Sequence, residues 1–373
     1  MMKKNKVQAL YIHIPFCEHI CDYCDFPKLQ YFRNFATEYI SSLKNELDSY
    51  RINKDDIQTI YVGGGTPTSL DDDLFLELLN IIKPYTNNVK EYTFEANPES
   101  LTLDKLMMMK RFGVNRLSIG VESTDDHILE SINRKHTFKD VITAVSNAKK
   151  VGFDNLNVDL IIGLPHVLKG QLEKDLDNIL SLGVNHISCY SLTVHPHTMF
   201  FIKGIEEPDD DIAREYYDLV EDKLTKNGFI HYEISNWAKL GKESLHNFTY
   251  WKDEQYYGIG LGAAGYIDNI RYVNTRNIQK YNQGDWLEEK EVVDKKDDIL
   301  YFIMLNLRTN RGIYFKEYKY RFDEDFYQKY EQTIEELLKE KCIILDRKEG
   351  RIYPTYEGMM ILDQLILKFT GDN

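Results

Sequence analysis

Three cysteines near the start of the chain constrain it more than any other feature. Cys17, Cys21 and Cys24 follow an apolar, strand-like run with C-x3-C-x2-C spacing. Three thiolates this close can hold three corners of a four-iron cluster and leave the fourth iron open to a small molecule. A zinc site usually has four nitrogen or sulfur ligands, so zinc would need His13 or His19 as the fourth. Structural cysteines have no reason to gather at ligand spacing, and the pattern therefore favours an iron–sulfur cluster.

The remaining composition fits a globular protein of a reducing compartment. The chain has 373 residues, which suggests about two domains. Its net charge of −14 argues against an electrostatic grip on nucleic acid. Cys189 and Cys342 are isolated, so no disulfide framework is expected. We read no signal peptide and no run of roughly 18 apolar residues, and we expect a cytoplasmic protein that binds no nucleic acid.

The first 240 residues alternate strand-like and helix-like segments. The predicted strands are Ala9–Ile14, Thr59–Gly63, Glu91–Ala96, Arg116–Val121, Asn157–Ile162 and His186–Thr193. The predicted helices include Asn34–Tyr50, Asp71–Ile82, Thr137–Val151, Lys169–Leu182 and Asp209–Asn227. Strands joined by helical crossovers imply a parallel sheet, so residues 1–240 are predicted to form an α/β barrel or partial barrel.

The rest of the chain divides into two further segments. Residues 241–296 are predicted as an extension rich in aromatic residues and glycine, ending in a polar linker over Gln279–Asp298. Residues 297–373 are predicted as a winged-helix-like α+β domain, with helices around a hairpin near Asp346–Gly350. Such domains often bind DNA, but the predicted helix Asp323–Lys341 carries seven acids and three bases. A DNA-reading helix should be basic, so we reject that use.

Polar or glycine-rich groups follow the predicted strands where each one ends. They include the Gly63–Thr68 loop, Glu95, Glu122 and His195, and the fifth predicted strand contains Asp159. In a parallel barrel these strand ends share one rim, where reactive groups collect. Consecutive glycines let a ligand lie against bare backbone N–H and C=O groups, which suits a molecule with both an amine and a carboxylate.

These motifs together resemble the radical S-adenosylmethionine (SAM) superfamily. The resemblance rests on the cysteine segment with its Tyr-Ile-His-Ile-Pro-Phe lead, the Gly-Gly-Gly-Thr-Pro-Thr loop and the Gly163–Pro165 turn. Within that superfamily, the sequence most resembles the branch that contains anaerobic coproporphyrinogen III dehydrogenase and the haem chaperones called HemW. It implies a partial (β/α)6 barrel and a [4Fe–4S] cluster on Cys17, Cys21 and Cys24, with SAM on the open iron.

The same resemblance implies which residues contact SAM. The expected contacts are Tyr11, Tyr23, Gly64, Gly65, Thr66, Glu95, Glu122, Arg134 and Asp159. Glu122 stands where the family usually has Gln. A carboxylate can still accept hydrogen bonds but lacks the amide donor.

Two observations separate the enzyme from the chaperone within this branch. The dehydrogenase has a further cysteine where this chain has Phe26. His246-Asn247-Phe-Thr-Tyr250-Trp251 matches the H-N-x-x-Y-W signature of the chaperones. Imidazole is a common haem ligand and the aromatic rings offer flat faces to a macrocycle, so the resemblance implies haem contact at His246. Without the resemblance, the favoured interpretation would be that His246 and Asn247 form hydrogen bonds in a loop and that the aromatic residues fill the core.

The resemblance therefore implies a haem chaperone that carries a [4Fe–4S] cluster and SAM. It would bind haem and transfer it to an acceptor haem protein, such as a respiratory enzyme. Transient membrane contact and a homodimer are further expectations. The alternative is an oxygen-independent coproporphyrinogen III oxidase or a related tetrapyrrole enzyme. We expect the chain to lack that activity.

Overall fold

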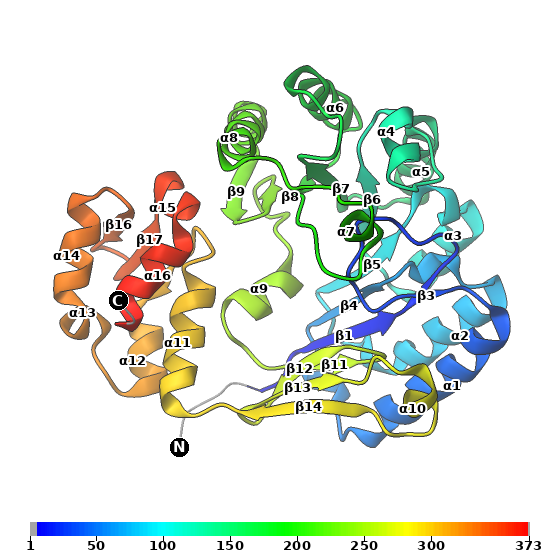
Figure 1. Cartoon of the computed structure of the whole chain (residues 1–373). Coiled ribbons are helices and arrows are strands. Elements are labelled where there is room, and N and C mark those ends of the chain that lie inside the picture. Colours follow the sequence, from blue (N-terminus) through cyan, green and yellow to red (C-terminus); the bar gives the residue numbers. More distant parts are fainter. Residues whose placement is uncertain (1–5, 372–373) are drawn as a thin grey trace.

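The computed structural model describes residues 6–371, and a twelve-stranded sheet runs through its larger part (Figure 1). Its centre is six parallel strands that follow one another in chain order, each beside the next. They are β1 (Ala9–Ile14), β4 (Thr59–Gly64), β5 (Glu91–Ala96), β6 (Arg116–Glu122), β7 (Leu156–Ile162) and β8 (His186–Ser191). This order confirms the predicted partial barrel.

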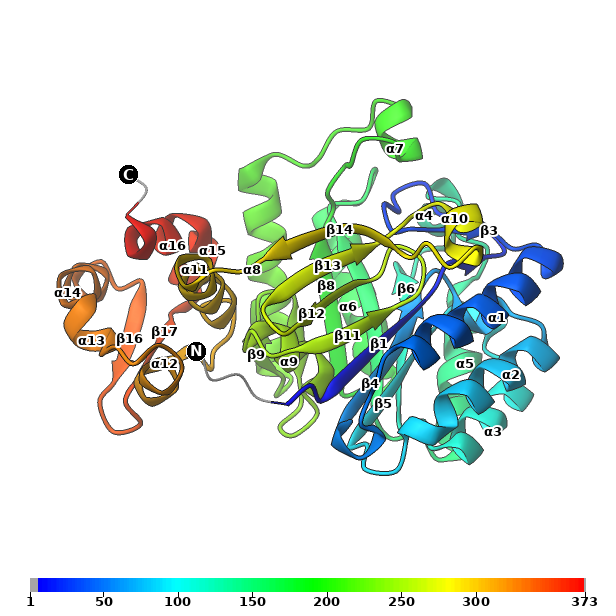
Figure 2. The ribbon, with the colours of Figure 1, turned by 90° about the horizontal axis from the view of Figure 1, so that it is seen from below.

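Helices that follow these strands in the chain cover the outer face of the barrel (Figure 2). They are α1 (Arg33–Ser49), α2 (Asp72–Ile82), α3 (Leu103–Phe112), α4 (Asp126–Ser131), α5 (Phe138–Val151), α6 (Lys169–Ser181) and α8 (Asp210–Lys226). Several start and stop signals are explicit in the sequence. Thr137 and Asp140 form a reciprocal capping box at the start of α5, and left-handed Gly152 ends that helix.

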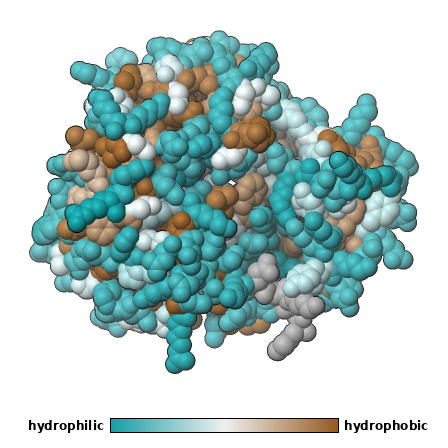
Figure 3. Space-filling model, turned by 180° about the vertical axis from the view of Figure 1, so that it is seen from behind, coloured by the Kyte–Doolittle hydropathy of each residue, from teal (hydrophilic) through white to brown (hydrophobic). Residues whose placement is uncertain are grey.

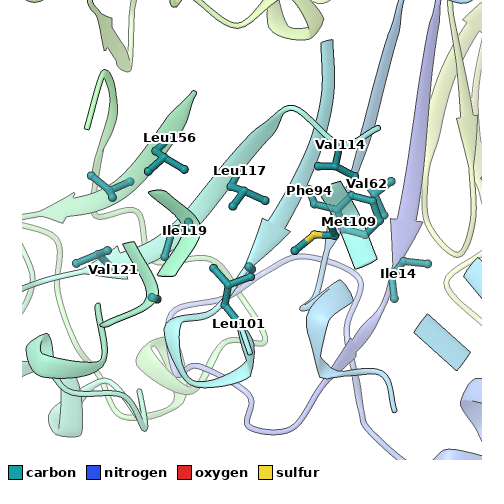
Figure 4. Close-up of a cluster of buried hydrophobic side chains, with 14 of the residues drawn as sticks. Ile14, Val62, Phe94, Leu101, Met109, Val114, Leu117, Ile119, Val121 and Leu156 are labelled. Carbon is teal, nitrogen blue, oxygen red and sulfur yellow. The ribbon is translucent and has the colours of Figure 1, made fainter. Parts of the chain in front are cut away.

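Strand alternation separates the core from the barrel interior. Leu117, Ile119 and Val121 of β6 are completely buried and belong to the hydrophobic cluster drawn in Figure 4. Successive side chains of a strand point to opposite faces. Arg116, Ser118 and Gly120 therefore face the inside of the barrel, where they line a cavity.

Both edges of the parallel sheet are extended by antiparallel strands. After β8 come β10 (Asn236–Ala238) and β9 (Ile230–Glu233). On the other side β11 (Tyr256–Ile259) runs parallel to β1 and leads to β12 (Ala264–Ile267), β13 (Ile270–Asn274) and β14 (Leu287–Val292). The predicted linker over 279–298 is wrong in this respect, because it contains β14. That strand pairs with β13 at an exposed edge, which explains its polar sequence.

Helix α9 (Leu245–Trp251) closes the barrel at the amino ends of the strands. Glu91, the first residue of β5, accepts hydrogen bonds from the backbone N–H groups of Leu245 and His246, both at 2.9 Å. The same carboxylate accepts from the hydroxyl of Ser244, the N-cap of α9. The two backbone bonds satisfy N–H groups that a helix start leaves without partners, and all three bonds fix the helix under the sheet.

The C-terminal part has its own hydrophobic core. Its helices are α11 (Lys295–Asn306), α12 (Phe315–Phe322), α13 (Phe326–Lys329), α14 (Glu331–Lys339), α15 (Tyr356–Met360) and α16 (Leu362–Thr370). Its small sheet has the order β15 (Ile313–Tyr314), β17 (Arg351–Pro354), β16 (Ile343–Asp346). Helices around a hairpin were predicted here.

The helices of this part are interrupted at two places, the first of which lies within the predicted helix Asp323–Lys341. Tyr330 separates α13 from α14, and Ile361 separates α15 from α16; both residues leave the helical conformation. The ring of Tyr330 packs against Phe326 and Phe369, with centroids 4.8 and 5.5 Å away. Tertiary packing of this aromatic side chain therefore accompanies a break that helical periodicity alone did not reveal.

The two parts touch along β9. Glu233 of β9 forms a β-bridge with Thr309, and the N–H of Asn310 donates to the carbonyl of Tyr232. The surface seen from behind is mostly hydrophilic, with small hydrophobic patches (Figure 3). No helix among residues 6–371 is long and apolar enough to cross a membrane.

Candidate functional site

A cavity of about 380 Å³ occupies the inside of the partial barrel. All three cysteines of the opening motif line it, together with Gly64, Gly65 and residues of strands β4 to β8. The cysteine loop follows β1, so it stands at the carboxyl ends of the parallel strands. This is the edge at which α/β barrels place their reactive groups.

The cysteine loop is closed at its base by a short pair of parallel strands, β2 (Phe16–Cys17) and β3 (Leu29–Gln30). The short helix α7 (Met199–Ile202) lies against the loop, where the N–H of Phe200 donates to the carbonyl of Asp22 at 2.9 Å. Lys203 forms an ion pair with the Asp22 carboxylate at 2.5 Å. A loop held at both places presents its thiols in a fixed arrangement.

The three thiols lie close enough to influence one another. Burial raises the pKa of Cys17 to about 12, against the effect of a hydrogen bond from the Thr66 hydroxyl, and Cys21 and Cys24 add to the rise. Burial likewise raises the pKa of Cys24 to about 11. A metal that binds here must displace protons from both thiols.

The donor set fits an iron–sulfur cluster. Among residues 6–371, no three His, Cys, Asp or Glu side chains gather as a single metal ion requires. A four-iron cluster is larger than one ion and takes thiolate ligands. Cys17, Cys21 and Cys24 supply three such ligands around one cavity.

The glycine loop brings bare backbone to the cavity wall. Gly64 has φ +114°, and a Cβ there would collide with the ring of His13. A Cβ on Gly63 would lie 2.5 Å from the carboxyl carbon of Glu95. Glu95 accepts hydrogen bonds from the Gly64 N–H at 2.9 Å and the Tyr61 hydroxyl at 2.7 Å. Glycine at both positions is what allows strand β4 to lie against this carboxylate.

Arg134 and Glu122 meet at one side of the cavity. The guanidinium donates to Glu122 Oε1 at 2.6 Å, to Asn97 Oδ1 at 2.9 Å and to the Gly120 carbonyl at 2.9 Å. Glu122 adopts a left-handed backbone with φ +64°, and the register of β6 against β7 shifts beside it. A buried, non-glycine residue in this conformation marks a site where local geometry is held by its surroundings.

Asp159 of β7 pairs with Gly120 of β6, one pair nearer the amino ends of the strands than Glu122. Its carboxylate accepts from Asn157 at 2.8 Å and from the Ser118 hydroxyl at 3.3 Å. Burial, with the negative charges of Glu122 and Glu95, raises the pKa of Asp159 to about 7. The cavity therefore holds several carboxylates that can accept hydrogen bonds from a ligand.

The two predicted tyrosines have different places. Tyr23 lines the cavity and packs against Phe200 of α7, with ring centroids 6.3 Å apart. Tyr11 lies within the barrel but outside the set of lining residues, and its hydroxyl is 2.9 Å from His13 Nδ1. Of the nine predicted SAM contacts, eight thus line one cavity.

His246 does not line the cavity. The ring is completely buried, with Nδ1 2.9 Å from the Thr59 hydroxyl and Nε2 2.8 Å from the Tyr250 hydroxyl. Burial lowers its pKa to about 3. In this conformation both ring nitrogens are engaged, and the neighbouring Asn247 lines the cavity instead.

The sequence did not single out the residues at the deep end of the cavity. They are Arg116, Asn157 and Ser188, all of which line it. Asn247 lines the cavity with them and was named only as part of the chaperone signature. Asn157 donates to the hydroxyls of Ser118 at 2.7 Å and Ser188 at 2.9 Å. Polar residues at alternate positions of β6, β7 and β8 were the available signal, because two polar interior positions in succession are unusual in a buried parallel strand.

The comparisons with known proteins agree with this geometry. The family model "Radical SAM superfamily" matches residues 11–179, and "HemN C-terminal domain" matches residues 293–361. A solved structure, coproporphyrinogen III oxidase (HemN) from Escherichia coli, superposes with a TM-score of 0.84 at 20% identity. It covers 98% of this chain and 91% of that chain, and it shows the fold.

Curated relatives extend over nearly the whole chain. "Heme chaperone HemW" of Bacillus subtilis (strain 168) is 36% identical over 98% of this chain and 100% of its own length. The protein of the same description from Lactococcus lactis subsp. lactis (strain IL1403) is 36% identical over 99% of both chains. That of Escherichia coli (strain K12) is 34% identical over 82% of this chain and 84% of its own. The chain therefore belongs to the HemW family of the radical SAM superfamily.

Proposed function

We propose that this protein is a haem chaperone, which binds haem and transfers it to an acceptor protein. The observation that carries the proposal is the 36% identity to curated haem chaperones over nearly the full length of both chains. The match includes both the barrel and the C-terminal part, so the whole architecture is shared with those relatives.

Membership of the radical SAM superfamily implies a [4Fe–4S] cluster and SAM. We propose Cys17, Cys21 and Cys24 as the cluster ligands, and the glycine loop with Glu95 and Asp159 as part of the SAM site. When bound, the cluster and SAM supply radical chemistry. Glu95 and Asp159 offer acceptors for an amine, and the N–H groups of the glycine loop offer donors for a carboxylate.

The mouth of the cavity supports an apolar ligand or partner. Phe26 on the cysteine loop is 61% exposed, and Phe201 and Ile202 of α7 are 56% and 68% exposed. A flat, largely apolar macrocycle can cover such side chains. We propose this rim as the place where haem or its acceptor approaches.

Three finer points are also proposals. The acceptor would be a respiratory haem enzyme, which the protein would reach from the cytoplasm through transient membrane contact. The chain would act as a homodimer. We further propose the division into residues 1–240, 241–296 and 297–373, which is supported by the separate hydrophobic core of the last segment.

The alternative is oxidation of coproporphyrinogen III, because the HemN enzyme shares the fold. By the resemblance described above, the coproporphyrinogen III dehydrogenases have a further cysteine at the position where this chain has Phe26. Cluster-reconstituted protein, incubated anaerobically with SAM, reductant and coproporphyrinogen III, should form no protoporphyrinogen. Product formation would establish the enzyme instead.

The haem proposal is tested by titrating the full-length, cluster-reconstituted protein with hemin and following absorbance. We expect the absorbance change to saturate at one equivalent of hemin. When the haem-loaded protein is then mixed with the haem-free form of an acceptor protein, haem should move to the acceptor. Absence of saturable binding contradicts the proposed function.

A further inference from the structure

Arg116 is a buried cation for which the fold supplies no counter-ion in contact. It opens β6, its side chain is only 2% exposed, and it lines the cavity. Across residues 6–371 its guanidinium takes part in no hydrogen bond and in no ion pair within 4.0 Å, and its Nε is buried without a partner.

An unpaired buried charge is costly, because protein interiors solvate ions poorly. The charge of Arg116 does act at longer range. Burial raises the pKa of Glu95, and the charge of Arg116 opposes that rise. Burial lowers the pKa of His186 and of His246, and the charge of Arg116 adds to that lowering. These are distant effects, and they leave the five N–H donors of the guanidinium without acceptors. Such a group is poised to bind an anion.

The position of Arg116 is the far end of the cavity from the cysteines. The cysteine loop stands at the carboxyl ends of the strands, whereas Arg116 is the first residue of its strand. From Arg116 to Gly120, which also lines the cavity, the strand rises about 13 Å. The deep end is thus well separated from the thiols.

Asn247 reaches the same cavity from α9, which closes the barrel below. Among the described residues its side-chain amide makes no hydrogen bond, so it too has a free donor. Asn157 and Ser188 add polar atoms to the wall. One guanidinium and one amide can together grip a small planar anion, since the guanidinium fork matches a carboxylate.

The carboxylates that line the cavity favour an anion of low charge. Glu95, Glu122 and Asp159 line the same cavity, and of these three only Glu122 forms an ion pair with a cation in the described part of the chain. A doubly charged phosphate would be repelled by these carboxylates more strongly than a singly charged carboxylate. The smaller charge is therefore favoured.

We propose that Arg116 and Asn247 form a carboxylate-binding site at the floor of the cavity. The carboxylate comes either from a free short-chain acid or from a propionate arm of haem. The second source rests on the proposed function, whereas the site itself does not.

The first arm of the test uses propionate ion. Thermal unfolding of the full-length, cluster-reconstituted parent is followed against sodium propionate, with sodium chloride at equal ionic strength as reference. We expect a saturable rise in Tm with propionate only. Arg116→Met should weaken this binding about tenfold or more, since a hydrogen-bonded charge is lost. Arg116→Lys should restore part of it.

Asn247→Leu provides a second variant, because it changes the floor without removing a charge. It should also weaken the propionate response. Lys290→Met, on the exposed strand β14, removes one positive charge elsewhere and should respond like the parent. If the parent responds to propionate no more than to chloride, or if Arg116→Met responds like the parent, the site is refuted.

The second arm compares hemin with its dimethyl ester, in which both propionates are masked. If haem supplies the carboxylate, the parent binds hemin about tenfold more tightly than the ester, and Arg116→Met binds both alike. Equal binding of both by the parent, together with a propionate response, assigns the site to a free acid. If the parent binds neither porphyrin, the proposed function fails while the propionate arm still decides the site.

Discussion

The guanidinium of Arg134 lies 2.6 Å from the carboxylate of Glu122, and neither side chain is more than a tenth exposed. Glu122 stands where the resembled family usually has Gln. With Glu at this position, Arg134 forms an ion pair where a Gln would offer it only a neutral hydrogen-bond acceptor. Without Glu122, Arg134 would be a buried cation whose hydrogen-bond acceptors within residues 6–371 are Asn97 and the Gly120 carbonyl.

Glu122→Gln should therefore reduce stability. A Gln can still accept one hydrogen bond from Arg134, so the loss should be about 1–3 kcal/mol, below the full cost of an unpaired buried charge. Urea unfolding measures it. Glu130→Gln, on an exposed position of α4, is the control and should stay within about 0.5 kcal/mol of the parent. Equal stability of the two variants would mean that the ion pair is not stabilising.

Serine in place of Cys17, Cys21 or Cys24 should each remove the cluster. A hydroxyl is a poor substitute for a thiolate ligand of iron. We expect bound iron and acid-labile sulfide to fall at least about tenfold after reconstitution, since even indirect changes around a metal site cost that much. Cys342→Ser, in the separate C-terminal core, is the control and should load normally. Full loading of Cys17→Ser would refute the ligand assignment.

Much of the barrel could be predicted from the sequence, because its signals are local. Each predicted central strand lies within two residues of the observed one, since apolar runs and turn residues bound it. The pairing of β11 with β1 could not be predicted, as Tyr256 opposes Ala9 from 247 positions away. A four-residue strand whose partner is so distant carries no local signal of its place.

The site divides in the same way. The family resemblance implied nine SAM contacts, and eight of them line the cavity. Arg116 was missed because its place in the cavity wall depends on the register of β6 and on the closure of the barrel by α9. His246 shows the opposite case. Its signature predicts haem contact, but periodicity cannot show that Thr59 and Tyr250 engage both ring nitrogens.

His246 can be tested with two variants that separate packing from ligation. His246→Ala removes a buried ring and leaves the hydroxyls of Thr59 and Tyr250 without their partner. It should cost about 2–4 kcal/mol in urea unfolding. Tyr250→Phe removes the hydroxyl near Nε2 and keeps the imidazole, so that nitrogen is freed.

If His246 contacts haem, as the signature predicts, Tyr250→Phe should bind hemin at least as tightly as the parent, and His246→Ala more weakly. Hemin titration at equal protein loading decides this. Identical affinities of all three proteins would contradict haem contact at His246 and leave it a structural residue.

Glu233 provides a prediction about pH. Its carboxylate is completely buried where β9 meets the C-terminal part, and burial raises its pKa to about 8. In the unfolded chain the pKa is near 4.5. Between these values the folded state holds a proton that the unfolded state has lost. This contribution to stability is therefore complete below about pH 4.5 and is lost as pH rises through about 8.

Glu233→Gln keeps the shape of the protonated acid and carries no proton to lose. Relative to the parent, the variant should gain up to about 1.4 kcal/mol of unfolding free energy per pH unit between pH 5 and pH 8. Urea unfolding at several pH values gives the difference curve. Glu289→Gln, on exposed β14, should give a flat difference curve. A flat curve for Glu233→Gln as well would mean that the buried carboxyl is ionised throughout and that its charge is compensated where β9 meets Thr309 and Arg308.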